Sequence, residues 1–437
     1  MLVVDKVIHI PKRFPSQLTD RFLDYIHQSG DMMIQLELQF KLQIDADRLA
    51  RATDLALDVS PVLGCRFVRQ WWKPHWERLS TETPHAFVRV RAKHDYESFK
   101  VTSIDAYSGP QVRVCLWNYP DGAHILFKVS HYVADAAGVK EVARIISSIY
   151  SRLRNDPDYQ PEPDLRSSRS VRQILRAVPL RFYPGLFFQF LSDNKASQSS
   201  KDILTISITK ERDDTLKFVD HILPKEHVSL ISEYAHNHEA TLNDMLLAAF
   251  FRALASTENW DGTKQLKATT TVDLRRYVVE RQVSAVANLS LPIWGWPNLN
   301  TDLGHDFLST LNRITTITKR RKQGYLGIET LLGILILLGP FPHYLAARSI
   351  GHGVQEKISK GNFAPAFTNM GIIGPEMVVF DSKPCKAQLL PPPVYPPWFM
   401  LGVSSYDGTV SLSAGLYSIQ TEHIKRFLDV MAAELPR

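Results

Sequence analysis

The chain has 437 residues, of which 44% are hydrophobic and 22% charged, a composition typical of a globular protein. Because a single hydrophobic core rarely extends beyond about 250–300 residues, this length predicts two domains. The 51 basic residues exceed the 45 acidic ones and give a net charge of +6, which suits an anionic partner without specifying one. The sequence has no basic stripe interleaved with aromatic residues, so we expect no nucleic-acid partner.

The cysteines and the apolar segments predict a cytoplasmic protein. The cysteines are odd in number and widely spaced, which fits neither a disulfide framework nor a metal site: Cys65, Cys115 and Cys385. The N-terminal stretch MLVVDKVIHIPKRF has Asp5 and Lys6 inside its apolar part, so it predicts a first strand and not a signal peptide. The apolar run 331–338 is far shorter than the roughly 20 residues that span a bilayer.

The first third of the chain alternates strand and helix patterns. Alternating hydrophobic residues predict a strand over 33–44, and a helical pattern follows over 45–58. Further strands are expected over 87–92, 111–118 and 123–130. Apolar residues at i, i+3, i+4 and i+7 then predict a helix with one buried face over 139–153. We interpret residues 1–160 as one α/β domain.

The composition changes in the middle of the chain. Residues 161–200 follow a proline-rich, acidic stretch and carry several arginines and the polar run SDNKASQSS, which predicts a linker with some helix in its middle. Strand and helix patterns resume near Leu204 and predict a second α/β domain over 201–437. Within it, the spacing of Thr241 and Asp244 indicates a capping box that opens a helix.

The segment HILFKVSHYVADAAGVKEVARII holds His131, Asp135 and Gly138. It places His131 at the end of an apolar strand, where a substrate can reach the imidazole. An imidazole with a pKa near 6.5 is suited to taking a proton from a hydroxyl or amine at neutral pH. The pattern therefore predicts that His131 is a general base, although a hydrogen-bonded structural histidine is the alternative. Asp135 cannot share its direction and is expected to hold the loop in shape.

The same histidine-to-aspartate spacing recurs at His27 and Asp31. There the histidine ends a helical pattern, and no glycine-started helix follows. We expect His27 and Asp31 to form a solvated surface pair without a catalytic role.

Five segments in order resemble motifs of the superfamily that contains chloramphenicol acetyltransferase, peptide-synthetase condensation domains, polyketide-associated acyltransferases, wax ester synthases and alcohol acetyltransferases. SHYVADAAG resembles its His-x-x-x-Asp-Gly active-site motif. The other matching segments are SPVLGCRF at 60–67, ATLNDMLLAAFFRAL at 240–254, TVDLRRY at 271–277 with ANLSLPIW after it, and FTNMGIIGP at 367–375. These short segments are spread in the same order across nearly the whole chain.

The resemblance implies two chloramphenicol acetyltransferase-like α/β domains, with mixed sheets flanked by helices and an active-site tunnel between them. His131 would lie mid-tunnel as the catalytic base, with Asp135, Gly138 and Arg275 supporting the site. Asp135 would pair with Arg275, and Arg276 is the second choice. Asn369 and the Gly371 backbone would bind the thioester carbonyl or the pantetheine arm of the donor; the alternative is that Asn369 only stabilises a turn. No bound cofactor or metal is implied.

Three positions depart from the superfamily pattern. Ser130 precedes His131, where condensation domains usually have a second histidine. Ala136 follows the aspartate in place of glycine, and Gly64 stands where an arginine is usual.

These observations leave three functional hypotheses. The first is an acyltransferase that moves an acyl group from acyl-CoA to a small-molecule alcohol or amine. The second is a free-standing condensation-type enzyme whose donor is bound to a phosphopantetheinyl carrier protein, which the arginines of the linker would dock. The third is a catalytically silent binding module, favoured by Ala136 and disfavoured by the intact His131 and Asp135.

Two apolar stretches remain unassigned, 174–191 and 331–338, with the basic run KRRK at 319–322 between them. Burial at the domain interface is the first interpretation. The alternative is a peripheral membrane or lipid-substrate surface, where basic residues meet headgroups and aromatic residues enter the interface.

Overall fold

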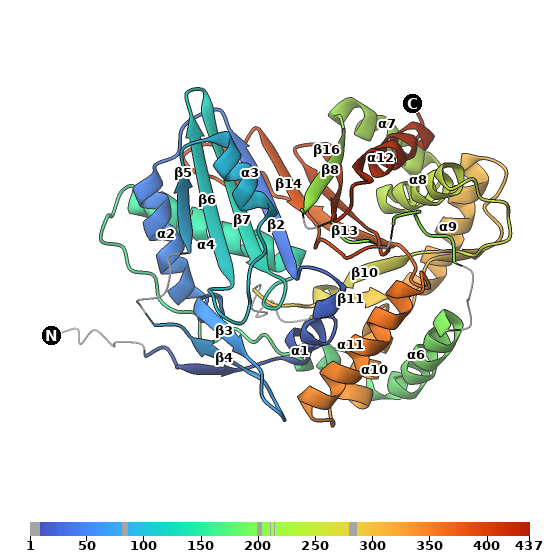
Figure 1. Cartoon of the computed structure of the whole chain (residues 1–437), viewed down its shortest axis with the longest axis horizontal. Coiled ribbons are helices and arrows are strands. Elements are labelled where there is room, and N and C mark those ends of the chain that lie inside the picture. Colours follow the sequence, from blue (N-terminus) through green and yellow to red (C-terminus); the bar gives the residue numbers. More distant parts are fainter. Residues whose placement is uncertain (1–8, 81–85, 199–202, 210, 214, 279–285) are drawn as a thin grey trace.

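The computed structural model describes residues 9–80, 86–198, 203–209, 211–213, 215–278 and 286–437. Two α/β halves lie side by side, each built on its own main sheet (Figure 1). Two small sheets complete the strand pairing: β1 (Arg13–Pro15), β4 (His75–Arg78) and β3 (Cys65–Val68) form one, and β12 (Asn298–Asn300) with β9 (Leu266–Lys267) forms the other.

The first main sheet confirms the strands predicted in the first third of the chain. Its order is β14-β2-β7-β6-β5, and the bounds are β14 (Lys386–Leu390), β2 (Met33–Phe40), β7 (Gly122–Ser130), β6 (Val112–Tyr119) and β5 (Phe87–Val90). Only β5 and β6 pair in parallel. β2 and β7 pair with Met33 opposite Ser130, the last residue of β7, so His131 directly follows the end of an inner strand.

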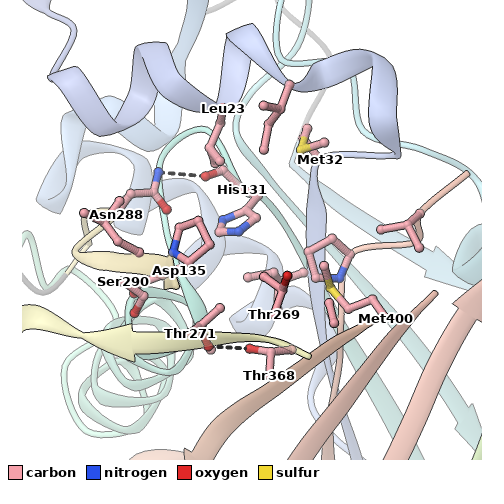
Figure 2. Close-up of a pocket in the computed structure, with 18 of the residues that line it drawn as sticks. Leu23, Met32, His131, Asp135, Thr269, Thr271, Asn288, Ser290, Thr368 and Met400 are labelled. Carbon is pink, nitrogen blue, oxygen red and sulfur yellow. Dashed lines mark hydrogen bonds between the residues drawn. The ribbon is translucent and has the colours of Figure 1, made fainter. Parts of the chain in front are cut away.

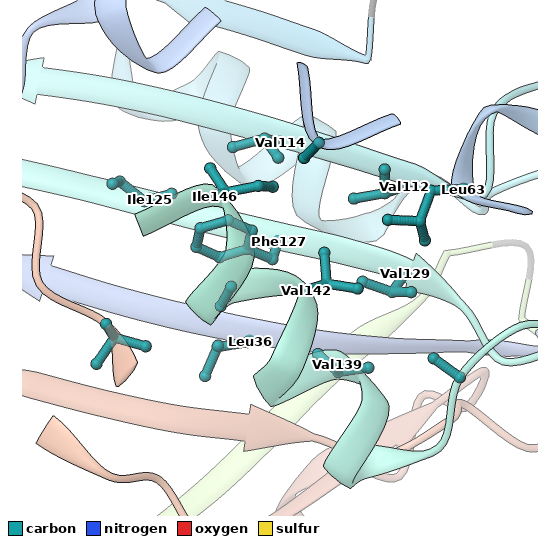
Figure 3. Close-up of a cluster of buried hydrophobic side chains, with 14 of the residues drawn as sticks. Leu36, Leu63, Val112, Val114, Ile125, Phe127, Val129, Val139, Val142 and Ile146 are labelled. Carbon is teal, nitrogen blue, oxygen red and sulfur yellow. The ribbon is translucent and has the colours of Figure 1, made fainter. Parts of the chain in front are cut away.

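Helices cover both faces of this sheet. The predicted helices appear as α2 (Ala46–Val59), whose first turn is capped by the Asp45 side chain, and α4 (Ala136–Leu153). Figure 3 shows α4 on the sheet, with Val139, Val142 and Ile146 directed onto the strands. On the other face, α3 (Lys93–Val101) contributes Tyr96 and Phe99 to a smaller cluster.

The edge strand β14 comes from the last fifth of the chain, far in sequence from its partner. Lys386–Leu390 pairs antiparallel with Gln35–Gln39 of β2. The ring of Phe380, just before β14, contacts the rings of Phe40 and Phe127. The C-terminal half therefore supplies both a strand and core side chains to the first sheet, which locks the halves together.

The second main sheet has the order β11-β10-β13-β15-β16-β8. Its strands are β11 (Ser290–Ile293), β10 (Thr269–Asp273), β13 (Ala366–Ile372), β15 (Met400–Tyr406), β16 (Thr409–Leu416) and β8 (Lys217–Leu223). Apolar side chains of α8 (Leu242–Thr257), α9 (Phe307–Lys322) and α12 (Thr421–Glu434) pack on it, and α7 (Lys225–Asn237) adds further contacts. The predicted capping box of Thr241 and Asp244 opens α8, which confirms a structural use for both residues.

The remaining helices lie beside the junction of the two halves. These are α1 (Leu18–Tyr25), α5 (Arg172–Arg176), α6 (Tyr183–Gln198), α10 (Ile328–Leu338) and α11 (His343–Ser359). Side chains of α1, α5 and α10 form a third apolar cluster with β10 and β11. The helix expected within 161–200 is present as α5 and α6. Across the described residues, no helix is both long and apolar enough to cross a membrane.

The packing of α4 on the first sheet predicts how much a core substitution destabilises the protein. Phe127 is fully buried, so Phe127→Ala should lower the free energy of unfolding by about 3–5 kcal/mol. The matched control is Leu42→Ala, because Leu42 is 61% exposed, and we expect it to change stability by no more than about 0.5 kcal/mol. Urea denaturation followed by circular dichroism measures both, and similar losses in the two variants would contradict this packing.

Candidate active site

A pocket at the junction of the two halves receives the side chain of His131 (Figure 2). Its empty space is about 1040 Å³, counted out to its open mouth. Most of its wall is apolar, and hydroxyl groups interrupt that wall on one side: Thr269, Thr271, Ser290 and Thr368. A second cavity of about 1100 Å³ adjoins it and shares Phe22, Ile26, Thr269 and Trp294 with it. His131 is among the lining residues of the first cavity and not of the second.

The backbone around His131 fixes which ring nitrogen carries the proton. His131 directly follows β7, and its N–H donates to the Met32 carbonyl at 2.7 Å. The ring Nδ1 lies 2.9 Å from the carbonyl oxygen of Ala134. Because a carbonyl oxygen can only accept a hydrogen bond, Nδ1 must carry the proton. The other nitrogen, Nε2, is then unprotonated and able to accept a proton.

The surroundings of His131 also favour the neutral ring. Burial lowers the pKa of His131 below its ordinary value, against the opposing effects of the Ala134 carbonyl and the Asp135 carboxylate. A lowered pKa means that the imidazole is unprotonated at neutral pH, which is the form a general base needs.

Asp135 lines the pocket and caps the helix that follows it, α4. Its side chain accepts hydrogen bonds from the N–H groups of Gly138 at 3.0 Å and Leu289 at 2.8 Å. The expected ion pair is present, with Arg275 Nη1 2.7 Å from Asp135 Oδ2. Burial tends to raise the pKa of Asp135, but the Arg275 guanidinium and these hydrogen bonds hold it below its ordinary value.

Arg275 differs from expectation in its local structure. It lies in a short 3-10 helix, Leu274–Tyr277, and not on a strand. That turn directs its guanidinium toward Asp135, Asp273 and the Ala287 carbonyl at once. Arg276, the second choice, is exposed and lies over the Tyr277 ring.

Asn288 is a site residue that the sequence motifs did not single out. It is 3% exposed, and its Nδ2 donates to the carbonyls of His131 at 2.7 Å and Tyr132 at 2.8 Å. Figure 2 shows it beside His131 at the pocket wall. It lies in ANLSLPIW, the segment that resembles an Asn-containing strand, and that resemblance was the available signal.

The two residues expected to bind substrate lie on and just after the pocket wall. Asn369 is exposed and lines the pocket, donates to Asn243 Oδ1 at 3.0 Å and accepts from the Gly371 N–H at 2.9 Å. Gly371 has φ +78° at an irregularity of β13, where Lys140 Nζ donates to the flanking carbonyls of Met370 and Ile372 at 3.0 Å. The contacts of Asn369 fit a turn-stabilising role, and substrate binding by either residue stays a prediction.

The interpretation of His27 and Asp31 as one solvated pair is wrong. His27 Nδ1 lies 2.7 Å from the Asp24 carbonyl, and its ring contacts Arg69. Asp31 instead accepts hydrogen bonds from the hydroxyls of Tyr395 and Tyr417. The two side chains therefore have separate partners. His27 is not among the residues that line the His131 pocket.

The linker arginines were expected to dock a carrier protein, and for one of them the structure shows a different use. Arg169 donates from both Nη atoms to the fully buried Asp20 at 3.0 Å. Its Nη2 also donates to the Val133 carbonyl, within the His131 loop. Arg169 is therefore occupied inside the protein and is not available to dock a carrier protein.

A metal centre finds no support in the described residues, among which no three His, Cys, Asp or Glu side chains gather as ligands.

The sequence and the fold of the chain were compared with those of known proteins. No protein-family model matches the chain. Bacitracin synthase 3 from Bacillus licheniformis is 22% identical over 180 residues, which is 38% of this chain and 3% of that protein. The match thus spans a very small part of that relative's length.

Solved structures match over almost the whole chain. The trichothecene 15-O-acetyltransferase from Fusarium sporotrichioides has a TM-score of 0.67 at 13% identity, over 97% of this chain and 95% of that one. The first condensation domain of the CDA synthetase gives 0.65 at 12%, over 97% of each chain. Polyketide synthase associated protein 5 from Mycobacterium tuberculosis gives 0.63 at 13%, over 97% and 99%.

These likenesses confirm the expected fold class. The chain has the two-domain α/β fold shared by condensation domains and chloramphenicol acetyltransferase-like acyltransferases. At 12–13% identity they establish the fold alone, so the reaction is argued from the site itself.

The buried ion pair makes a quantitative prediction. Arg275→Met leaves the Asp135 carboxylate buried without its cation, and we expect a loss of about 3–5 kcal/mol in the free energy of unfolding. Arg276→Met is the matched control and should change it by no more than about 0.5 kcal/mol. The double variant Asp135→Asn, Arg275→Met should lose less than the sum of the single variants. Additive losses in urea denaturation would refute the pairing.

Proposed function

We propose that this protein is an acyltransferase that moves an acyl group from an acyl thioester, acyl-CoA in the first instance, to a hydroxyl or amine acceptor. One observation carries the proposal: the Ala134 carbonyl holds the proton on Nδ1 of His131, so that Nε2 is a free base inside a pocket at the junction of the halves.

The reaction requires one base and space for two substrates. The acceptor O–H or N–H gives its proton to Nε2 as the oxygen or nitrogen attacks the thioester carbonyl carbon. The tetrahedral intermediate then collapses, the carbon–sulfur bond breaks, and the departing sulfur takes the proton back from the imidazolium. The products are an ester or amide and a free thiol, and His131 is returned to its starting form.

The pocket lining favours an apolar acceptor or acyl chain. The lining includes Phe22 and Leu23 of α1, Ile26 just after it, and the strand residues Leu291 and Met400. Such a wall binds hydrophobic groups by removing them from water, while the hydroxyls of Thr271 and Thr368 offer hydrogen bonds for orientation. In this proposal, Asn369 and the Gly371 backbone bind the thioester carbonyl or the pantetheine arm of the donor.

The carrier-protein donor is the second candidate. The similarity to a segment of bacitracin synthase 3 and the fold shared with a condensation domain favour it. Exposed arginines of the 161–200 segment, such as Arg166 and Arg172, suit an acidic carrier. A catalytically silent binding module is the third, since Ala136 lines the pocket at the position that is glycine in the superfamily pattern.

One experiment separates the candidates. Acyl-CoA and acylated carrier protein are each incubated with the protein and a panel of apolar alcohols and amines, and products are identified by mass spectrometry. Turnover of the CoA thioester supports the first proposal, and turnover of the carrier-bound thioester alone supports the second. Neither donor being consumed would favour the silent module.

His131→Ala should reduce acyl transfer by about 10²–10⁴-fold, because it removes the group that takes the proton. Its circular dichroism spectrum should match that of the wild type. The matched control is His27→Ala, which should keep nearly full activity because His27 lies outside the pocket lining. Retention of more than about a third of the activity by His131→Ala would refute the assignment, since removing a general base costs far more.

The pKa of His131 predicts the pH dependence. The base works only when unprotonated, so activity should be lost as the pH falls through the pKa of His131. Because burial lowers that pKa, the acid limb of kcat/KM should lie below pH 6.5, the ordinary value for histidine. A limb centred above pH 6.5 would contradict the buried, neutral imidazole.

A further inference from the structure

Large apolar side chains protrude along one edge of the molecule. The edge combines the turn between β3 and β4, the segment 180–191 that includes most of α6, and the segment 335–345 that joins α10 to α11; we call it the apolar edge. Figure 1 shows these three segments together at the lower side of the view. Its most exposed members are Trp71 at 58%, Trp72 at 55%, Leu180 at 77%, Phe188 at 68% and Phe341 at 57%.

Specific contacts hold the apolar edge in place. The Tyr344 and Trp71 rings stack with centroids 5.2 Å apart. Their backbones are joined as well, since the Tyr344 N–H donates to the Trp71 carbonyl at 3.2 Å and the His343 N–H to the Trp72 carbonyl at 3.1 Å. On the other side, Phe190 of α6 packs directly against Gly333 of α10. The aromatic side chains are therefore presented by a braced surface.

The structure divides the run 331–338 between two environments. Leu331, Leu332 and Ile334 are buried in the third apolar cluster, as the interface interpretation expected. Leu335, Ile336 and Leu337 are instead 37–48% exposed. Contiguous exposure of this kind on a folded protein marks an interaction surface.

The charges on this edge are of one sign. Segments 71–74, 172–192 and 335–354 contain no aspartate or glutamate. Their exposed basic residues are Lys73, Arg172, Arg176, Arg181 and Arg348. Of the acidic residues near these segments in sequence, Asp193 and Glu329 are paired with Arg321, and Glu356 is paired with Lys360. An edge of tryptophan, phenylalanine and leucine with surrounding arginines complements the headgroup region of an anionic bilayer, where aromatic rings enter the interface and arginines meet phosphates.

We propose that the apolar edge docks the protein on the surface of an anionic lipid membrane. Its side chains sit at a turn and at helix ends, which protrude and can enter a bilayer surface without needing a matching hollow in a partner. The helix α11 begins in this edge at His343 and lines the second cavity farther along, at Ile350, Gly353 and Val354. Docking is independent of the proposed acyl transfer, and each can fail without the other.

Sedimentation with phosphatidylcholine vesicles, with and without phosphatidylglycerol, tests the proposal. The protein should sediment with the anionic vesicles and be released at high salt, because salt screens the basic residues. Arg176→Glu, Arg181→Glu should weaken binding at least about tenfold, since each basic residue near an anionic surface contributes appreciably. The double variant Trp72→Ser, Phe341→Ser should weaken vesicle binding by a similar factor. Vesicles that contain brominated lipid should also quench its tryptophan fluorescence less than that of the wild type.

Matched controls change the same chemistry elsewhere. Two double variants alter exposed residues away from the edge and should bind like the wild type. One combines Lys41→Glu with Lys425→Glu, and the other combines Leu42→Ser with Ile419→Ser. His131→Ala should also bind vesicles fully, whether or not it is inactive. Equal recovery in the supernatant with and without anionic vesicles would overturn the proposal. So would a dimer, or a complex with acyl carrier protein, that is lost in the Trp72→Ser, Phe341→Ser variant, because either would assign the edge to a protein partner.

Discussion

The carboxylate of Asp135 is 2% exposed, and the groups that compensate its charge come from two distant parts of the chain. Gly138 belongs to the first turn of α4, whereas Arg275 and the Leu289 N–H come from the second half. A carboxylate withdrawn from water costs several kcal/mol unless such partners surround it. The loop that carries His131 therefore has its working shape only when the two halves are docked, and the free Nε2 depends on that shape.

Other buried polar contacts reinforce this junction from different directions. Asn288 holds the His131 and Tyr132 carbonyls from the side of β11. Arg169 reaches from the 161–200 segment to Asp20 of α1 and to Val133. Asp24, also in α1, accepts from Arg69, Tyr107 and Tyr132. These contacts fix the His131 loop by hydrogen-bond geometry as well as by apolar packing.

The local elements were largely predictable from the sequence. Alternation over 33–44 and the apolar periodicity over 139–153 predicted β2 and α4, because one buried face leaves a period of two or 3.6 residues. The capping box at Thr241 was also predictable, because its hydrogen bonds join residues only three positions apart. The location of His131 at a strand end followed directly from these elements.

Long-range pairing was not predictable in this way. The pairing of β14 with β2 joins residues about 350 positions apart, and the sequence of a five-residue strand does not identify its partner strand. The use of Arg169 inside the protein was also missed, since an arginine in a proline-rich, polar stretch looks solvated until its buried acid is known. Asn288 was not selected because its contacts are two backbone carbonyls, which any residue supplies, and its one signal was the resemblance of the segment ANLSLPIW.

The sequence by itself determined the strand and helix segments, the candidate base and, through the order of five motifs, the class of fold. Each of these depends on neighbours within a few residues or on motif patterns that can be read along the chain. The tertiary structure decided the shape of the His131 pocket, the compensation of Asp135 by Arg275 and the exposure of Leu335, Ile336 and Leu337 at the end of α10. All three depend on groups that become neighbours only when the chain has folded, and their energies are set by distance and burial in space.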